Sequence, residues 1–289
     1  FQASYEKILT CLKTLTVKGN FLNQIRKPKL SDIELIAMSV TAEYSSIYIE
    51  CQLFSLLPDE LSVKIERSVF NKRKRKLCPR ITMFQADIAS VFTSSEDYYV
   101  IDSISLEVTR LSRSARSKSW NEDYLSAPDK GYCASQRMYY YGYKLHAVCS
   151  LTGVFKSFDF TKASVYDIHY LQDVKDQLND RVLLGDRGYI RADVQLDLFE
   201  TRKIKLEVPT RNNQHNYRKQ AYIFRKSRKR IGTLFSQLCD QFMIRRNYAK
   251  TFEGFKTRIL TKIITLINIQ AINKLVLERN MYNIKINIA

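Results

Sequence analysis

Residues 182–190 read Val182-Leu183-Leu184-Gly185-Asp186-Arg187-Gly188-Tyr189-Ile190, a short apolar run that ends at a glycine and an aspartate. An apolar run bounded by glycines is typical of a buried strand that stops abruptly. Glycine adopts backbone angles that other residues resist, so the chain can turn where the Asp186 carboxylate emerges. We therefore expect Asp186 at the carboxyl end of a central strand, the edge at which open α/β sheets bind ligands. The simpler alternative is a turn aspartate paired with Arg187.

A second apolar run, residues 98–103, also delivers an aspartate, Asp102. Its aromatic and β-branched residues favour a strand. Two buried strands that each end in an aspartate predict two carboxylates at one point, where the charge of one raises the pKa of the other. A divalent cation relieves that repulsion, and Mg²⁺ prefers carboxylate oxygens together with phosphate oxygens as its ligands.

The composition limits the class of protein. A chain of 289 residues can form one large domain or two smaller ones, and a hydrophobic fraction of 45% is enough for a core. The balance of 47 Lys and Arg against 29 Asp and Glu gives a net charge of +18, which attracts polyanions, nucleic acid first among them. The alternatives are a merely basic protein or one at an anionic membrane. We expect no transmembrane helix, because no apolar run reaches the required length.

The cysteines and the first residues of the chain give less information about the class of protein. The six cysteines are scattered without a C-x-x-C pair, which disfavours a zinc site and favours buried thiols over disulfides. The chain opens at Phe1 rather than at a methionine, which fits a fragment, and no signal-peptide pattern follows.

Residues 1–92 are predicted to form an all-helical, DNA-binding domain. Ser31 and Glu34 match a capping box, so a helix should begin there. The basic run that follows further on is either a solvated helix face or a phosphate-contacting surface; its members are Lys72, Arg73, Lys74, Arg75 and Lys76. A helix-turn-helix arrangement is one possibility for this region.

The centre of the chain changes to strands. Strands are predicted at 98–108, 139–148, 154–160, 181–184 and 204–208, with helices at 167–178 and 193–201. The resulting order is three strands, helix, strand, helix, strand. The final third is predicted to hold two helices, at 217–242 and 252–277; the apolar stripe of the second is read as core packing.

This order of elements, with one aspartate on the first strand and another after the fourth, resembles the ribonuclease-H-like fold of DDE transposases and retroviral integrases. The chain looks most like bacterial insertion-sequence transposases of the nine-eighty-two family. The segments that carry the resemblance are 99–103 (Tyr-Val-Ile-Asp-Ser), 141–147 (Tyr-Gly-Tyr-Lys-Leu-His-Ala), 183–189 (Leu-Leu-Gly-Asp-Arg-Gly-Tyr), 228–238 (Arg-Lys-Arg-Ile-Gly-Thr-Leu-Phe-Ser-Gln-Leu) and 245–250 (Arg-Arg-Asn-Tyr-Ala-Lys).

The resemblance implies an α/β catalytic core over residues 93–289, with a mixed five-stranded sheet flanked by helices. It implies a site for two Mg²⁺ ions, with Mn²⁺ as a substitute, in which Asp102 and Asp186 are catalytic and metal-binding. A third ligand should be a glutamate in an Arg-x-x-x-Glu-x-x-Phe pattern, but that position is Gly232. Asp240 and Glu253 lie too far along the chain to take its place without rearrangement.

Several basic residues are expected to contact DNA. On the strand at 139–148, Lys144 and His146 share one face, which could point toward DNA or the site; a structural role for the histidine is equally favoured. Arg187 either steadies phosphate beside Asp186 or pairs with a nearby acid. The last two DNA-binding candidates lie on the helix at 217–242, where the alternative is a solvated face; they are Arg228 and Arg230.

The predicted function is therefore Mg²⁺-dependent DNA cleavage and strand transfer at the ends of an insertion sequence, impaired in this copy by Gly232. The partners implied are double-stranded DNA, at element ends and target, and a second copy of the chain in a homodimer, without a membrane. The location implied is the bacterial cytoplasm, at the nucleoid. One alternative is a non-catalytic DNA-binding remnant or regulator; a ribonuclease-H-like repair nuclease fits less well.

Overall fold

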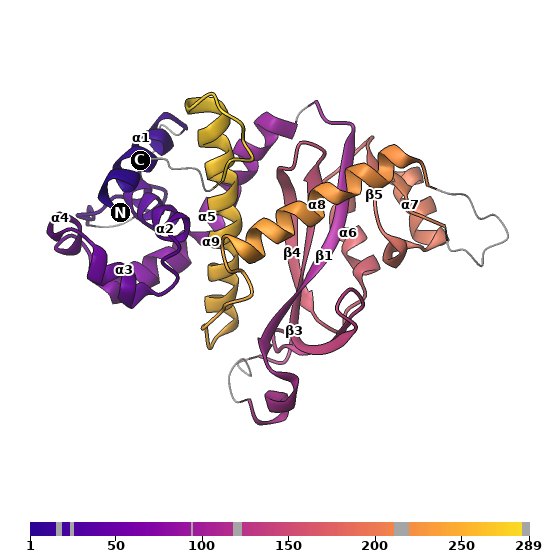
Figure 1. Cartoon of the computed structure of the whole chain (residues 1–289), viewed down its shortest axis with the longest axis horizontal. Coiled ribbons are helices and arrows are strands. Elements are labelled where there is room, and N and C mark those ends of the chain that lie inside the picture. The colour runs from indigo at the N-terminus through magenta and orange to yellow at the C-terminus, as the bar shows by residue number, and fades with distance from the viewer. Residues whose placement is uncertain (16–18, 24–25, 94, 118–122, 211–219, 285–289) are drawn as a thin grey trace. The chain divides into compact units, whose positions relative to one another are not determined.

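The computed structural model describes residues 1–15, 19–23, 26–93, 95–117, 123–210 and 220–284 (Figure 1). These form two compact units. The helical unit combines residues 1–88 with 238–289, and the sheet unit is formed by residues 89–237. The sheet unit is therefore inserted between the two parts of the helical unit. The predicted start of the helix at residue 217 lies outside the described residues.

The sheet unit is built on a mixed sheet with the strand order β2-β3-β1-β5-β6, to which β4 is added through β3. The strands are β1 (Tyr98–Thr109), β2 (Asp129–Cys133), β3 (Met138–Ser150), β4 (Phe155–Lys162), β5 (Val182–Leu184) and β6 (Lys205–Glu207). β1 pairs with β5, and β5 with β6, in parallel, whereas β3 pairs antiparallel with β1, β2 and β4.

The described sheet has six strands where five were predicted. The additional strand is β2, whose sequence Asp-Lys-Gly-Tyr-Cys has too little apolar alternation to indicate a strand by itself. It forms because β3 is long enough to pair with two partners along one edge. Residues 138–142 of β3 pair with β2, and residues 143–149 pair with β4.

The helices of this unit pack on the sheet through apolar side chains. A buried cluster joins Tyr99 and Ile101 of β1 to residues of α6 (Tyr170–Lys175) and α7 (Ala192–Arg202). Since side chains alternate along a strand, Val100 and Asp102 point to the other face. On α8 (Tyr222–Asp240), Phe235 contacts Phe155 of β4, with ring centroids 6.3 Å apart. The unit also contains three short 3₁₀ helices, η1 (Leu111–Arg116), η2 (Asp167–His169) and η3 (Arg187–Tyr189). The predicted helix at 167–178 is thus a 3₁₀ turn followed by the short α6.

The helical unit holds α1 (Gln2–Leu15), α2 (Asp32–Tyr44), α3 (Glu50–Leu56), α4 (Asp59–Ser62), most of α5 (Arg67–Thr93), α9 (Phe252–Ala271) and the π-helical turn η4 (Ile272–Val276). The predicted capping box is confirmed. The Ser31 side chain accepts a hydrogen bond from the Glu34 backbone N–H, and the Glu34 carboxylate accepts one from the Ser31 N–H.

Helix α9 is the central helix of this unit. Every described residue from Ile259 to Ala271 is buried, and α9 packs against α2. The stripe predicted to be core is therefore core, although it belongs with the first 88 residues rather than with the sheet. By length and composition, residues 252–276 pass as a membrane span, with a mean hydropathy of 1.4, which corrects the expectation that no apolar run is long enough. Since 78% of the apolar window is buried inside the protein, packing within the chain explains its composition.

Candidate active site and basic surfaces

The two aspartates found in the sequence lie at neighbouring parallel strands, Asp102 within β1 and Asp186 just after β5. The pairing of β1 with β5 aligns Val100 with Leu184. Asp102 and Asp186 each lie two residues beyond this aligned pair. The same alignment therefore places Asp102 beside Asp186, which is just past the end of β5. Asp186 caps η3, and its Oδ1 accepts a 2.8 Å hydrogen bond from the Gly188 N–H. The Gly188 N–H therefore orients the Asp186 carboxylate, but neither Gly185 nor Gly188 has a positive φ, so the turn does not use the backbone freedom that the sequence suggested.

Asp102 is held in a setting that opposes its negative charge. Burial raises its pKa from 3.8 to about 6. The Ser103 N–H, which donates to Asp102 Oδ1 at 2.8 Å, and the Arg228 guanidinium lower this pKa, whereas the charges of Asp186 and Asp167 raise it further. A cation bound beside Asp102 would relieve both the desolvation and the repulsion.

Asp167, which precedes α6 in η2, is a third carboxylate close to this pair. A Cβ added to Gly188 would lie 3.0 Å from Asp186 Oδ1 and 3.7 Å from Asp167 Oδ2, so both carboxylates border the same small space. Sequence reasoning missed Asp167 because it lies in a short turn without apolar periodicity. The only signal was its place between a strand and a helix, which many turn aspartates share.

Lys144 and His146 of β3 face Asp167. Lys144 Nζ donates to Asp167 Oδ1 at 3.0 Å and to the Val165 carbonyl at 2.8 Å. His146 is fully buried, stacks on the Tyr170 ring at a centroid distance of 5.1 Å, and has Nδ1 3.9 Å from Asp167 Oδ1. Burial lowers its pKa to about 4, although Asp167 acts to raise it, so the imidazole is neutral at pH 7. The contacts of His146 are those of a core residue.

Tyr189 is a buried residue close enough to the three aspartates to be affected by their charges. Its side chain is fully buried, and its hydroxyl has no hydrogen-bond partner among the described residues. Burial raises its pKa well above 10, and the charges of Asp167, Asp102 and Asp186 add to that shift. Tyr189 is therefore a neutral phenol that offers one unused polar atom next to the carboxylates.

Gly232 of α8 is exposed to solvent, and an added Cβ at this position would meet no atom within 4 Å. Arg228 lies one helical turn earlier and acts on Asp102. Residues four apart share a helix face, so a side chain at position 232 would share the face of Arg228. Arg230 donates from Nε to the Leu151 carbonyl at 3.2 Å, which ties its guanidinium to the β3–β4 turn.

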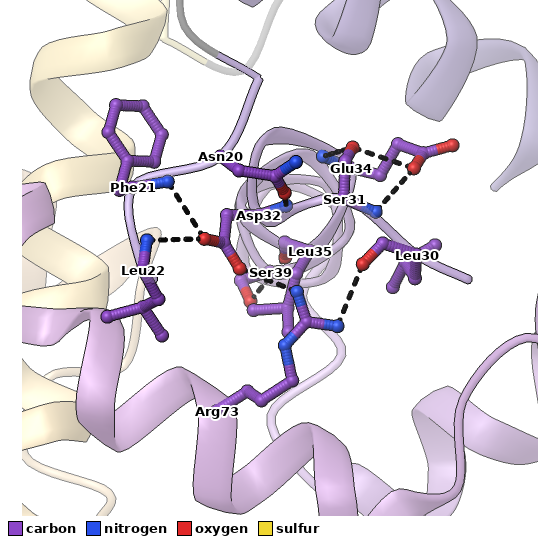
Figure 2. Close-up of polar contacts among 10 residues, drawn as sticks. All are labelled: Asn20, Phe21, Leu22, Leu30, Ser31, Asp32, Glu34, Leu35, Ser39 and Arg73. Carbon is purple, nitrogen blue, oxygen red and sulfur yellow. Dashed lines mark hydrogen bonds and ion pairs between the residues drawn. The ribbon is translucent and has the colours of Figure 1, made fainter. Parts of the chain in front are cut away.

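The members of the basic run on α5 differ in their surroundings, and Figure 2 shows the contacts of Arg73. Arg73 forms an ion pair with the fully buried Asp32 and donates from Nη1 to the Leu30 carbonyl at 2.8 Å. Asp32 also accepts from the Phe21 and Leu22 N–H groups, each at 2.9 Å. Arg73 was predicted to contact DNA, but it connects α5 to α2; the exposed members of the run are Lys72, Arg75 and Lys76.

The carboxylates of Asp102, Asp186 and Asp167 fit the requirements of a divalent cation only in part. Asp102 and Asp186 supply oxygens of the type that Mg²⁺ prefers, in a setting that a cation would stabilise. Within the described ranges, however, no group of three or more His, Cys, Asp or Glu side chains is close enough to hold a metal ion. Asp167 is already engaged by Lys144.

A family model described as a transposase DDE domain matches residues 93–268. The chain belongs to this transposase family. The match covers more than half of the chain and includes β1, which carries Asp102, the turn after β5 that holds Asp186, and α8, which carries Gly232. Transposases of this family act on DNA by phosphoryl transfer, generally use divalent metal ions and are typically cytoplasmic. No curated protein matches the chain.

The boundaries of the region that matches the family model differ from those of the two compact units. The matched region runs through α9 to residue 268, although residues 238–289 cluster with the first 88. The sequence-defined domain and the packed unit therefore have different boundaries at the C-terminal side.

Proposed function

We propose that this transposase cuts and joins DNA at the ends of an insertion sequence of the nine-eighty-two type, with Asp102 and Asp186 as its catalytic, metal-binding residues. The observation that carries the proposal is their place at the same end of two adjacent parallel strands, Asp102 within β1 and Asp186 just after β5, with the charge of Asp186 helping to raise the pKa of Asp102. A buried acid whose ionisation is opposed by a neighbouring acid is typical of sites that bind a cation or handle protons.

The residues around the pair have distinct roles in this proposal. Asp102 and Asp186 would hold Mg²⁺, or Mn²⁺ in its place, which when bound would supply an activated water and stabilise charge on the phosphate. Arg228 and Arg187 offset the negative charge of the scissile phosphate, and the neutral, buried Tyr189 excludes water next to the carboxylates. Water attacks the phosphate at the element end and displaces the 3′ oxygen. The freed 3′ hydroxyl then attacks a target phosphate in line and displaces the 3′ oxygen of the target strand, without a covalent protein intermediate.

Gly232 leaves the site short of one anionic ligand. Two carboxylates against two divalent cations give one ion no protein anchor, so we expect this copy to bind DNA and to cleave it poorly. The exposed position of Gly232 and the free space around it favour this view, because a glutamate there would meet no obstruction.

The test is to restore the acid. We expect Gly232→Glu to raise Mg²⁺-dependent nicking of a duplex that carries the element ends by at least the roughly hundredfold effect typical of a single positioned catalytic group. Gly232→Gln is the matched control, since it has the same length without the charge. Equal nicking by the unmodified chain, the Glu variant and the Gln variant would overturn the missing-acid proposal.

The second candidate is a DNA-binding remnant or regulator without catalysis, which Gly232 and the net charge of +18 favour. Substitution of Asp102 in the Gly232→Glu background separates the two. An enzyme loses nicking with Asp102→Asn and keeps its DNA binding, whereas a binder has no nicking to lose.

The proposed oligomeric state, location and DNA contacts follow from the need to act on two element ends. Two element ends must be brought together, so the transposase is proposed to act as a homodimer on double-stranded DNA, in the bacterial cytoplasm at the nucleoid. Lys72, Lys74, Arg75 and Lys144 complete the basic residues proposed to meet DNA.

A further inference from the structure

Two adjoining hollows in the helical unit are lined by basic side chains from distant parts of the chain. The first is a pocket of about 280 Å³ between α5 and the start of α9. Its cations are Lys74 and Arg75 from α5 and Lys250 and Arg258 from the other side. The second is a wider groove of about 790 Å³ on the neighbouring side of α5; its basic lining residues are Arg26, Lys72, Arg73, Arg75 and Lys76.

The charge of both hollows is strongly positive. Glu50 is the one acidic side chain among the described residues that line the pocket, and Arg258 Nη2 pairs with its Oε2 at 2.6 Å. That pair leaves Lys74, Arg75 and Lys250 without an acidic counterpart among the described lining residues. The described lining of the groove contains no acidic side chain, and the fully buried Asp32 neutralises Arg73 from behind.

Arg75 joins the two hollows, because it lines both. Residues of a helix are spaced 100° apart around its axis. Lys74 and Arg75 therefore face the pocket, while Lys72 and Lys76, one turn apart, face the groove. The Arg73–Asp32 ion pair connects α5 to α2 (Figure 2), while Lys72, Arg75 and Lys76 are exposed and Lys74 is half-buried.

The floor of the pocket adds weaker attraction for an anion. Thr251 caps α9, and its Oγ1 accepts a 3.1 Å hydrogen bond from the Gly254 N–H. A Cβ at Gly254 would lie 2.9 Å from that oxygen, so glycine leaves room for this cap, and both Thr251 and Gly254 line the pocket. The N-terminus of a 20-residue helix carries a partial positive charge, which supplements the lysines.

We propose that the pocket and the groove form one basic track that binds the sugar–phosphate backbone of duplex DNA, with Lys74, Arg75 and Lys250 in the pocket and Lys72 and Lys76 in the groove. The proposal rests on the proposed function in taking DNA as the partner. A track of cations that continues from one hollow to the next suits a continuous polyanion better than a small anion. Contacts of this kind position the protein on DNA without reading its sequence.

The experiment measures binding of the full chain to a random-sequence duplex by fluorescence anisotropy, in EDTA and over a range of salt concentrations. We expect Lys74→Gln/Lys250→Gln to weaken binding by roughly tenfold and to make the slope of log K against log salt shallower by about 1.8, which is about 0.9 for each phosphate that the variant no longer neutralises. Lys72→Gln/Lys76→Gln tests the groove in the same way. Both variants should unfold at the temperature of the unmodified chain.

The matched control is Lys7→Gln/Lys13→Gln. These two exposed lysines lie on α1 of the same unit and do not line either hollow, and the change in charge is identical. A loss of affinity in the control equal to that of the track variants would mean that net charge alone governs binding and would overturn the proposal. Unchanged affinity and slope in both track variants would also overturn it.

Two further measurements distinguish DNA binding from membrane binding, and the basic track from the proposed catalytic function. Loss of binding to phosphatidylglycerol vesicles, with duplex binding retained, would assign the track to a membrane surface and overturn the DNA proposal. Binding in EDTA does not depend on catalysis, so absence of nicking in the Gly232→Glu chain would contradict the proposed function and leave this measurement intact.

Discussion

At the scale of single residues, the chain gathers three aspartates where the sequence indicated two. Asp102 and Asp186 were predictable because each follows an apolar run, and a strand that ends in a carboxylate is visible in the sequence. Asp167 was not, because it lies in a short turn and is held by an ion pair with Lys144 of β3, 23 residues earlier in the chain. The absence of a glutamate at Gly232 could be read from sequence, but only through the resemblance to a family.

Asp102 should make the stability of the metal-free protein depend on pH. Its pKa is raised from 3.8 to about 6 on folding, so the folded state prefers the protonated form. Protonation of Asp102 makes its full contribution to the free energy of unfolding below about pH 4, and this contribution is lost as the pH rises through about 6. At about 1.4 kcal/mol for each pH unit between the two pKa values, the loss is on the order of 2 to 3 kcal/mol.

We therefore expect Asp102→Asn to stabilise the sheet unit at pH 7.5 in EDTA and to have a smaller effect at pH 4.5. Thermal unfolding at the two pH values measures this. Added Mg²⁺ should raise the unfolding temperature of the unmodified chain and have less effect on the variant. Destabilisation by Asp102→Asn at pH 7.5 would show that the charged carboxylate is already compensated without a metal.

At the scale of helices, buried ion pairs decide which faces are exposed. The basic run of α5 was visible in the sequence, yet nothing local distinguishes Arg73 from its neighbours; the difference is Asp32, which lies elsewhere in the chain. Likewise, the periodicity of α9 predicted a core helix but could not tell that Lys262 within it is buried against Glu43 of α2, at 2.6 Å.

The Lys262–Glu43 pair gives a test of α2–α9 packing. Burial lowers the pKa of Lys262, while Glu43 raises it, so removal of the glutamate leaves a cation poorly solvated. We expect Glu43→Gln to reduce the free energy of unfolding by roughly 3 kcal/mol, and Glu43→Leu/Lys262→Met to recover most of that loss. Urea unfolding of both variants measures the difference; a double variant weaker than the single one would contradict this account.

At the scale of the whole molecule, the packed units do not follow the order of the chain. The sequence indicated helices, then a sheet, then helices, and this order is correct. It placed a boundary after residue 92 and assigned everything beyond it to one domain. The structure instead groups residues 238–289 with the first 88, because α2 packs on α9. Such pairing between chain ends has no local sequence pattern.

A fragment of residues 1–92 should therefore not fold by itself. It lacks α9, the partner of α2, and leaves Glu43 without Lys262. We expect the fragment to show no cooperative thermal transition by circular dichroism, while the full chain does. A cooperative transition of the isolated fragment would show that the first four helices and α5 suffice for a core.

The nesting of one unit inside the other also affects how the protein is made. Residues 89–237 are complete before α9 has been synthesised, so the sheet can form on the ribosome while α1 to α5 still await their central partner. Residues 1–88 are thus translated before the sheet unit but reach their native packing only after α9 has followed. During that interval their apolar faces are uncovered, and a nascent chain that stalls before residue 252 would depend on chaperones to stay in solution.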